Sequence, residues 1–154
     1  MRGPNERKVM AVDIPDLMKM TQAQLDDLFK QSPAGPIPDG EAQGTAIVAP
    51  GTELEGTAAK FIHYFAWQGK VFDAGKGQLR NKILPMGLKA IIADVYKDAS
   101  WYDGKECIAL DYSKTSLLAH YIRDEIRQVG DGVYLGIVFW GKTKLIDFAL
   151  KFPK

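Results

Sequence analysis

The sequence predicts a mainly β fold, in which an antiparallel barrel of about seven to eight strands follows one or two N-terminal helices. From residue 70 onward, short apolar runs alternate with turn signals, as is typical of an antiparallel sheet. Asp103-Gly104 and Gly130-Asp131-Gly132 mark hairpin turns. Residues 145–152 alternate apolar and polar side chains, so we expect one face of that strand to be buried and the other to be wet. Sheets of this kind generally close, because closure removes their unpaired edges.

Length and composition predict a single globular unit. The chain has 154 residues, of which 46% are hydrophobic and 25% are charged. We expect a flexible N-terminal extension over residues 1–20 and one barrel domain over residues 21–154. The formal net charge of +1 argues against nucleic-acid binding, which requires an excess of Lys and Arg on one face.

The numbers of cysteines and histidines and the hydropathy pattern limit which disulfides, metal sites and membrane segments the chain can form. One cysteine cannot form an intrachain disulfide, and a composition of two histidines and one cysteine argues against a metal site. We expect no metal and no cofactor. No apolar run approaches the roughly 18 residues of a membrane span, and the first twenty residues lack a signal-peptide pattern. We therefore expect a cytoplasmic protein with no membrane span.

The first third of the chain predicts the helices and a connector. Thr21 and Gln24 have the spacing of a capping box, and the helix that follows should end near Lys30. Residues 32–44 contain three prolines and three glycines, which predicts an irregular connector. We expect a strand over residues 44–49 and a second helix over residues 58–68.

The rest of the chain predicts strands. We expect them over residues 70–73, 79–84, 89–97, 106–112, 121–129, 133–140 and 145–152. One stretch is ambiguous, because Leu118, Ile122 and Ile126 fit helical spacing whereas Ile122, Asp124 and Ile126 fit one strand face. We favour a strand from Tyr121, because the Gly-Asp-Gly turn after it leads into a strand of matching length.

Polar groups on otherwise apolar strand faces are the candidates for function, because a barrel of about eight strands can hold one small ligand. Asp94 and Asp111 lie on such faces, and Arg123, Arg127 or Lys89 could pair with them. A buried carboxyl group with a raised pKa could act as a general acid or base. A structural ion pair is the commoner role for such a residue.

Histidine, cysteine and aromatic residues give weaker signals. His63 and His120 are more often structural than catalytic, and Cys107 is most simply a small buried apolar group. Several large aromatic side chains with polar tips suit either a ligand cavity or an ordinary core. They are Trp67, Trp101, Tyr112, Tyr134 and Trp140.

Three segments together resemble small bacterial lipocalin-like (calycin) domains of unassigned function. They are residues 67–73 (WQGKVFD), 100–105 (SWYDGK) and 122–136 (IRDEIRQVGDGVYLG). The similarity spans about residues 25–152. The chain departs from the pattern at Ala46, where a Gly-x-Trp strand would have tryptophan at the closed end of the barrel. The resemblance implies a lipocalin-like barrel that binds a hydrophobic or amphipathic small molecule, without naming a substrate.

Three functional hypotheses follow. The first is binding of a small apolar ligand, with Trp67, Tyr112 and Trp140 as apolar walls and Arg123 meeting a polar end of the ligand. The second is a cofactor-independent isomerase, cyclase or dehydratase in the same cavity, for which an acid–base pair is required. Its candidate pair is Asp111 or Glu125 with His120 or Tyr112. The third is an interaction domain that forms a homodimer.

Overall fold

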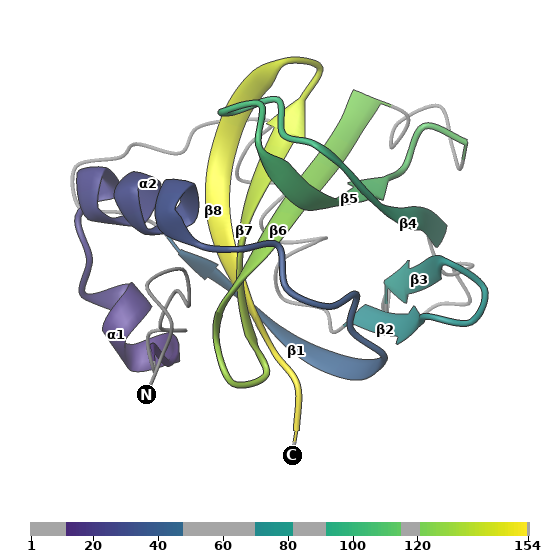
Figure 1. The fold of residues 1–154 in the computed structure, drawn as a ribbon, viewed down its shortest axis with the longest axis horizontal. Coiled ribbons are helices and arrows are strands. Elements are labelled where there is room, and N and C mark those ends of the chain that lie inside the picture. Colours follow the sequence, from purple (N-terminus) through teal and green to yellow (C-terminus); the bar gives the residue numbers. More distant parts are fainter. Residues whose placement is uncertain (1–11, 48–69, 82–91, 115–120, 154) are drawn as a thin grey trace, which may run out of the picture.

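The protein is a closed antiparallel β-barrel preceded by two helices (Figure 1). The structure, a computed structural model, describes residues 12–47, 70–81, 92–114 and 121–153. Within these ranges, eight strands pair in sequence order, and β1 closes the barrel against β8. The predicted fold class is therefore confirmed. The second helix expected over residues 58–68 lies outside the described residues.

Each strand pairs with its neighbours in the antiparallel sense. The strands are β1 (Gly40–Ile47), β2 (Lys70–Asp73), β3 (Gln78–Asn81), β4 (Ile92–Ala99), β5 (Glu106–Asp111), β6 (Ile122–Gly130), β7 (Val133–Trp140) and β8 (Thr143–Lys151). The described part of the ambiguous stretch forms strand β6 from Ile122 on, as we favoured, whereas residues 115–120 lie outside the described residues. Strand β1 begins at Gly40, four positions before the expected start, because residues 40–42 pair with β2.

Alternation along the strands sends one set of apolar side chains into the barrel. They form a single buried cluster that includes Phe72, Leu79, Val95, Leu110, Ile126, Val138, Phe148 and Leu150. Glycine is required at Gly136, because the ring of Phe148 on the paired strand occupies the space that a Cβ there would fill. The predicted buried face of residues 145–152 is confirmed, and its Phe148 and Leu150 belong to the interior cluster. The opposite face was expected to be wet, and this is corrected: Asp147 and Ala149 on it are buried beside helix α2 and the outer cluster.

A second apolar cluster lies outside the barrel wall. Helix α2 (Gln22–Gln31) begins at the predicted capping box of Thr21 and Gln24 and buries Leu25 and Phe29. These side chains pack with the outward-facing Leu135, Ile137 and Ala149. Figure 1 shows both helices on one side of the barrel, beside β8. In the described ranges, no helix is long and apolar enough to cross a bilayer.

The expectation of a flexible extension is corrected for residues 12–20. They contain helix α1 (Ile14–Met18), which is capped by reciprocal hydrogen bonds between Asp13 and Asp16. Leu17 is fully buried in the outer cluster, and Lys151 of β8 pairs with Asp13 at 2.8 Å. The segment is ordered because its few apolar residues find a docking surface on the barrel.

The connection between β4 and β5 differs from the expected two-residue turn at Asp103-Gly104. The strand pairing ends at Ala99 and Glu106, which leaves a six-residue loop over residues 100–105. Gly104 has the expected positive φ of 76°. The longer loop forms because polar side chains from β6 reach its backbone, as described below.

Candidate functional site

Three polar side chains meet inside the barrel, namely those of Lys70, Tyr112 and Asp124. Lys70 lies on β2, Asp124 on β6, and Tyr112 directly follows β5. The Nζ of Lys70 donates a hydrogen bond to the Tyr112 hydroxyl at 3.0 Å and lies 3.7 Å from Oδ2 of Asp124. Because β2 and β6 are not neighbours in the barrel, these side chains can meet only across its interior.

The surroundings of this trio are apolar. Asp124 alternates with Ile122 and Ile126 on the inward face of β6, and the Lys70 amine lies 5.9 Å from the centre of the Phe148 ring. Lys70 and Asp124 are each only 2% exposed. An unpaired charge in such a place would cost several kcal/mol, because it loses its hydration. The attraction between the Lys70 and Asp124 charges offsets part of this cost.

One oxygen of Asp124 has no internal hydrogen bond. Its Oδ1 is buried and has no partner in the described part of the chain. More than about nine in ten buried polar groups in proteins are hydrogen-bonded, and an unmet one costs roughly 1–3 kcal/mol or more when charged. This oxygen is therefore the feature of the interior that most clearly points to a function.

Burial governs the protonation of the pair. It raises the pKa of Asp124 to about 6, although the Lys70 charge and the nearby Tyr112 hydroxyl act in the opposite direction. Burial likewise lowers the pKa of Lys70, and the charge of Asp124 partly offsets this. A carboxyl group that titrates near neutrality can accept a hydrogen bond, or a proton, from a molecule placed beside it.

Two predicted site residues lie at this interior. Tyr112 is fully buried and belongs to the trio. Trp140 is half-buried and packs against the interior cluster. Trp67, His120 and His63 lie outside the described residues.

The predicted site residues Arg123, Glu125 and Asp111 lie on the outside of the wall, so their assignment to the interior is corrected. Arg123, Glu125 and Arg127 alternate with the inward residues of β6, and Arg127 donates to the Phe29 carbonyl of α2 at 2.9 Å. This face therefore lies under the helix. Asp111 pairs in register with Arg123 and shares the outward orientation.

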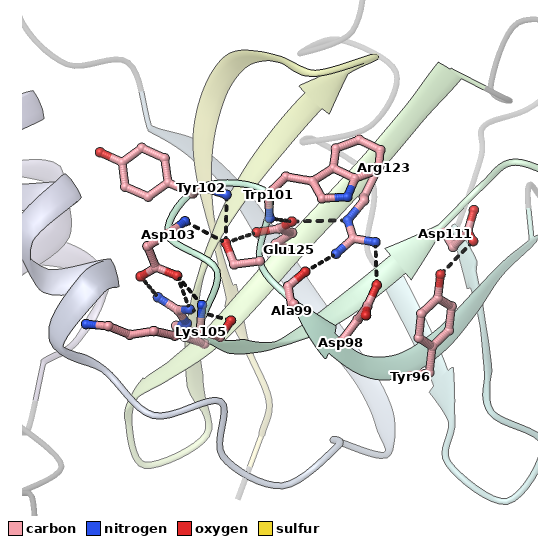
Figure 2. Close-up of polar contacts among 12 residues, drawn as sticks. Tyr96, Asp98, Ala99, Trp101, Tyr102, Asp103, Lys105, Asp111, Arg123 and Glu125 are labelled. Carbon is pink, nitrogen blue, oxygen red and sulfur yellow. Dashed lines mark hydrogen bonds and ion pairs between the residues drawn. The ribbon is translucent and has the colours of Figure 1, made fainter.

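Glu125 and Arg123 close the loop over residues 100–105 (Figure 2). The fully buried Glu125 carboxylate accepts hydrogen bonds from Ser100 Oγ at 2.5 Å, from the Trp101 backbone N–H at 2.8 Å and from Arg123 Nε at 3.1 Å. Arg123 also donates to Asp98 at 2.9 Å and to the Ala99 carbonyl at 3.0 Å. Their contacts are those of a structural network.

Arg127 joins the same loop to helix α2. Its guanidinium donates to both carboxylate oxygens of Asp103, at 2.6 and 2.7 Å, and to the carbonyls of Phe29, Lys105 and Glu106. The hydrogen bond from Arg127 holds the pKa of Asp103 below its usual value. Every N–H of the guanidinium is thus used for structure.

Asp111 is not placed to act as a general acid. Burial would raise its pKa, but hydrogen bonds from Ser113 and from the Tyr96 hydroxyl leave it lowered. Figure 2 shows the Tyr96 hydroxyl donating to Asp111, at 2.8 Å. Asp111 is therefore ionised at neutral pH. Cys107 is fully buried, and burial raises its pKa to about 12, as befits the apolar role that the sequence predicted.

Comparisons with protein-family models, curated proteins and solved structures find no match for this chain. The lipocalin-like resemblance accordingly stays a prediction beside the confirmed barrel. Sequence reasoning missed Lys70 and Asp124 as site residues. The available signal for Asp124 was its place between Ile122 and Ile126 on one strand face, whereas nothing local in the sequence pairs it with Lys70.

Proposed function

We propose that the barrel binds a small hydrophobic or amphipathic molecule in its interior, in the manner of a lipocalin-like protein. The single observation that carries the proposal is Oδ1 of Asp124, a buried charged acceptor that has no hydrogen-bond partner among the described residues. A bound molecule that donates a hydrogen bond to this oxygen would remove the cost of leaving it unmet. The apolar side chains around it would contact the rest of the molecule.

The proposal is tested with N-phenyl-1-naphthylamine, a neutral apolar fluorophore. We expect its fluorescence to rise saturably with one molecule bound per chain, and native mass spectrometry of protein from its own host to reveal a stoichiometric apolar passenger. Val138→Trp, which adds volume to the interior cluster, should weaken fluorophore binding at least about tenfold while circular dichroism confirms folding. A folded wild-type protein with neither saturable binding nor a passenger would contradict the proposal.

A second candidate is proton-transfer catalysis in the same interior without a cofactor. The observation in its favour is that the Asp124 carboxyl, with a pKa of about 6, lies in apolar surroundings with Lys70 and Tyr112. Such a group can take a proton from an acidic carbon. In this form of the hypothesis Asp124 replaces Asp111 and Glu125, which lie on the outer face.

An activated carbon acid tests this second candidate directly. In 5-nitrobenzisoxazole, removal of the ring C–H proton by a base breaks the N–O bond and gives a coloured cyanophenolate. We expect the protein to accelerate this reaction with a rate that rises through about pH 6 and is lost in Asp124→Asn. An equal rate for wild type and variant would exclude Asp124 as the base.

The dimer hypothesis stays a prediction. Deletion up to Met20 would remove the buried Leu17, so it would disturb the outer cluster as well as any interface. Size-exclusion chromatography of the full chain across a concentration series is the cleaner test, and a purely monomeric profile would rule the hypothesis out.

A further inference from the structure

We propose that the ligand carries a neutral hydroxyl group and that this group donates its hydrogen bond to Oδ1 of Asp124. The inference rests on the proposed ligand-binding function and specifies the chemistry of the ligand. It depends on three properties of the interior. They are the type of the polar atom that lacks a hydrogen-bond partner among the described residues, the balance of charge around that atom, and the polarity of the surrounding side chains.

The unmet atom fixes the polarity of the contact. An ionised carboxylate oxygen can only accept hydrogen bonds. The other oxygen of Asp124, Oδ2, faces the Lys70 amine at 3.7 Å, while Oδ1 has no partner within the described ranges. A ligand group beside Oδ1 must therefore be a donor. Ethers, esters and ketones offer only acceptors and would leave the carboxylate oxygen unmet.

The balance of charge makes a neutral donor the best fit. Lys70 and Asp124 form a pair of opposite charges that are both buried. A carboxylate head group would bring a second negative charge against Asp124, and an ammonium group would bring a second positive charge near Lys70. Either ion would also lose its hydration in an apolar interior. A hydroxyl group donates without adding charge.

The rest of the ligand should be apolar. The trio is embedded in the interior cluster, in which Leu110, Ile126 and Phe148 present only hydrocarbon surface. Burial of alkyl or ring carbons against such side chains is favourable, whereas further polar groups would lack partners. The chemical class is thus an alcohol on an aliphatic chain or an apolar ring system.

A matched series of ten-carbon molecules tests the head group. Each competes with N-phenyl-1-naphthylamine for the wild-type protein at about pH 7.5, where Asp124 is ionised. The series is 1-decanol, 1-methoxydecane, decanoate and decylammonium. We expect 1-decanol to bind at least about tenfold more tightly than each of the others, because only it donates without adding charge.

The variant Asp124→Asn should remove this preference. Its amide would turn the oxygen toward Lys70 and present N–H donors to the ligand, so 1-methoxydecane should bind as well as 1-decanol. Asp147→Asn is the matched control. Asp147 is also a buried aspartate beside a lysine, Lys144 at 3.2 Å, but it lies on the outer face and contacts Gln22 of α2. We expect this control to keep the wild-type preference.

The outcomes separate this inference from the function on which it rests. Tightest binding of decanoate or decylammonium, or equal binding of all four, would overturn the hydroxyl assignment while leaving ligand binding intact. A folded protein that does not bind the fluorophore would overturn ligand binding itself. If Asp124→Asn fails to fold, the ranking of the four molecules on the wild-type protein still decides the matter.

Discussion

At Asp124 the folded chain keeps a carboxyl group in apolar surroundings, so protonation of this group is coupled to folding. The pKa of about 6 in the folded protein lies above the roughly 3.9 of an unfolded chain. At pH values between these two pKa values, Asp124 is mostly protonated in the folded state and mostly ionised in the unfolded state. The contribution of Asp124 to stability is therefore fully present below about pH 4 and is lost as the pH rises through 6.

We expect this coupling to disappear in Asp124→Asn. Relative to the variant, the free energy of unfolding of the wild type should fall by about 2–3 kcal/mol between about pH 4 and pH 7. Urea unfolding of both proteins at the two pH values measures the difference. A wild-type-to-variant difference that does not change with pH would show that Asp124 is not held in its neutral form by burial.

At the scale of elements, Arg127 connects β6, α2 and the loop over residues 100–105. Arg127→Lys keeps the positive charge but loses the planar set of donors, and lysine cannot satisfy both Asp103 and the three carbonyls. We expect a loss of about 2–4 kcal/mol in the free energy of unfolding, measured by urea denaturation.

The matched control for this substitution is Arg80→Lys on β3, where the arginine is exposed. It should change stability by no more than about 0.5 kcal/mol. If both variants were equally stable, the hydrogen bonds of the Arg127 guanidinium would make no net contribution to the free energy of unfolding.

Helix α1 gives a second prediction at this scale. Leu17 is fully buried in the outer cluster, whereas its neighbour Met18 is 47% exposed. We expect Leu17→Ala to lower the free energy of unfolding by about 2–4 kcal/mol, and Met18→Ala to change it by less than about 0.5 kcal/mol. Thermal unfolding followed by circular dichroism compares the two. Equal small effects would mean that α1 does not dock as described.

At the scale of the whole molecule, the sequence predicted the strands better than their inner faces. In β8, apolar side chains alternate with Asp147 and Lys151, so a buried face was predicted, and this face lies in the interior cluster. The expectation that the opposite face is wet was wrong, because Asp147 and Ala149 are buried beside α2. In β6, nearly every residue is buried on one side or the other, because one face lines the barrel and the other lies under α2 and the loop. Charged residues occur on both faces, so the pattern alone could not identify the inner one.

The candidate site was harder to predict than the fold for the same reason. Arg123 and Glu125 were chosen as charged groups on a strand, and they lie one position away from Asp124 on the opposite face. Lys70 is far from Asp124 in the sequence and meets it only because the barrel closes. Local propensity and capping placed α2, whereas a contact across the barrel depends on the complete topology.

The central claim is that Asp124 recognises the polar group of the ligand, and the titration of its own carboxyl carbon tests this most directly. Carbon-13 NMR of the wild-type protein should give a midpoint near pH 6 without ligand. Saturation with 1-decanol should lower the midpoint by about one pH unit. The reason is that a hydroxyl donor that binds about tenfold more tightly to the ionised carboxylate than to the neutral carboxyl group shifts the titration by the same factor of ten. A midpoint that does not move when 1-decanol is bound would contradict the claim.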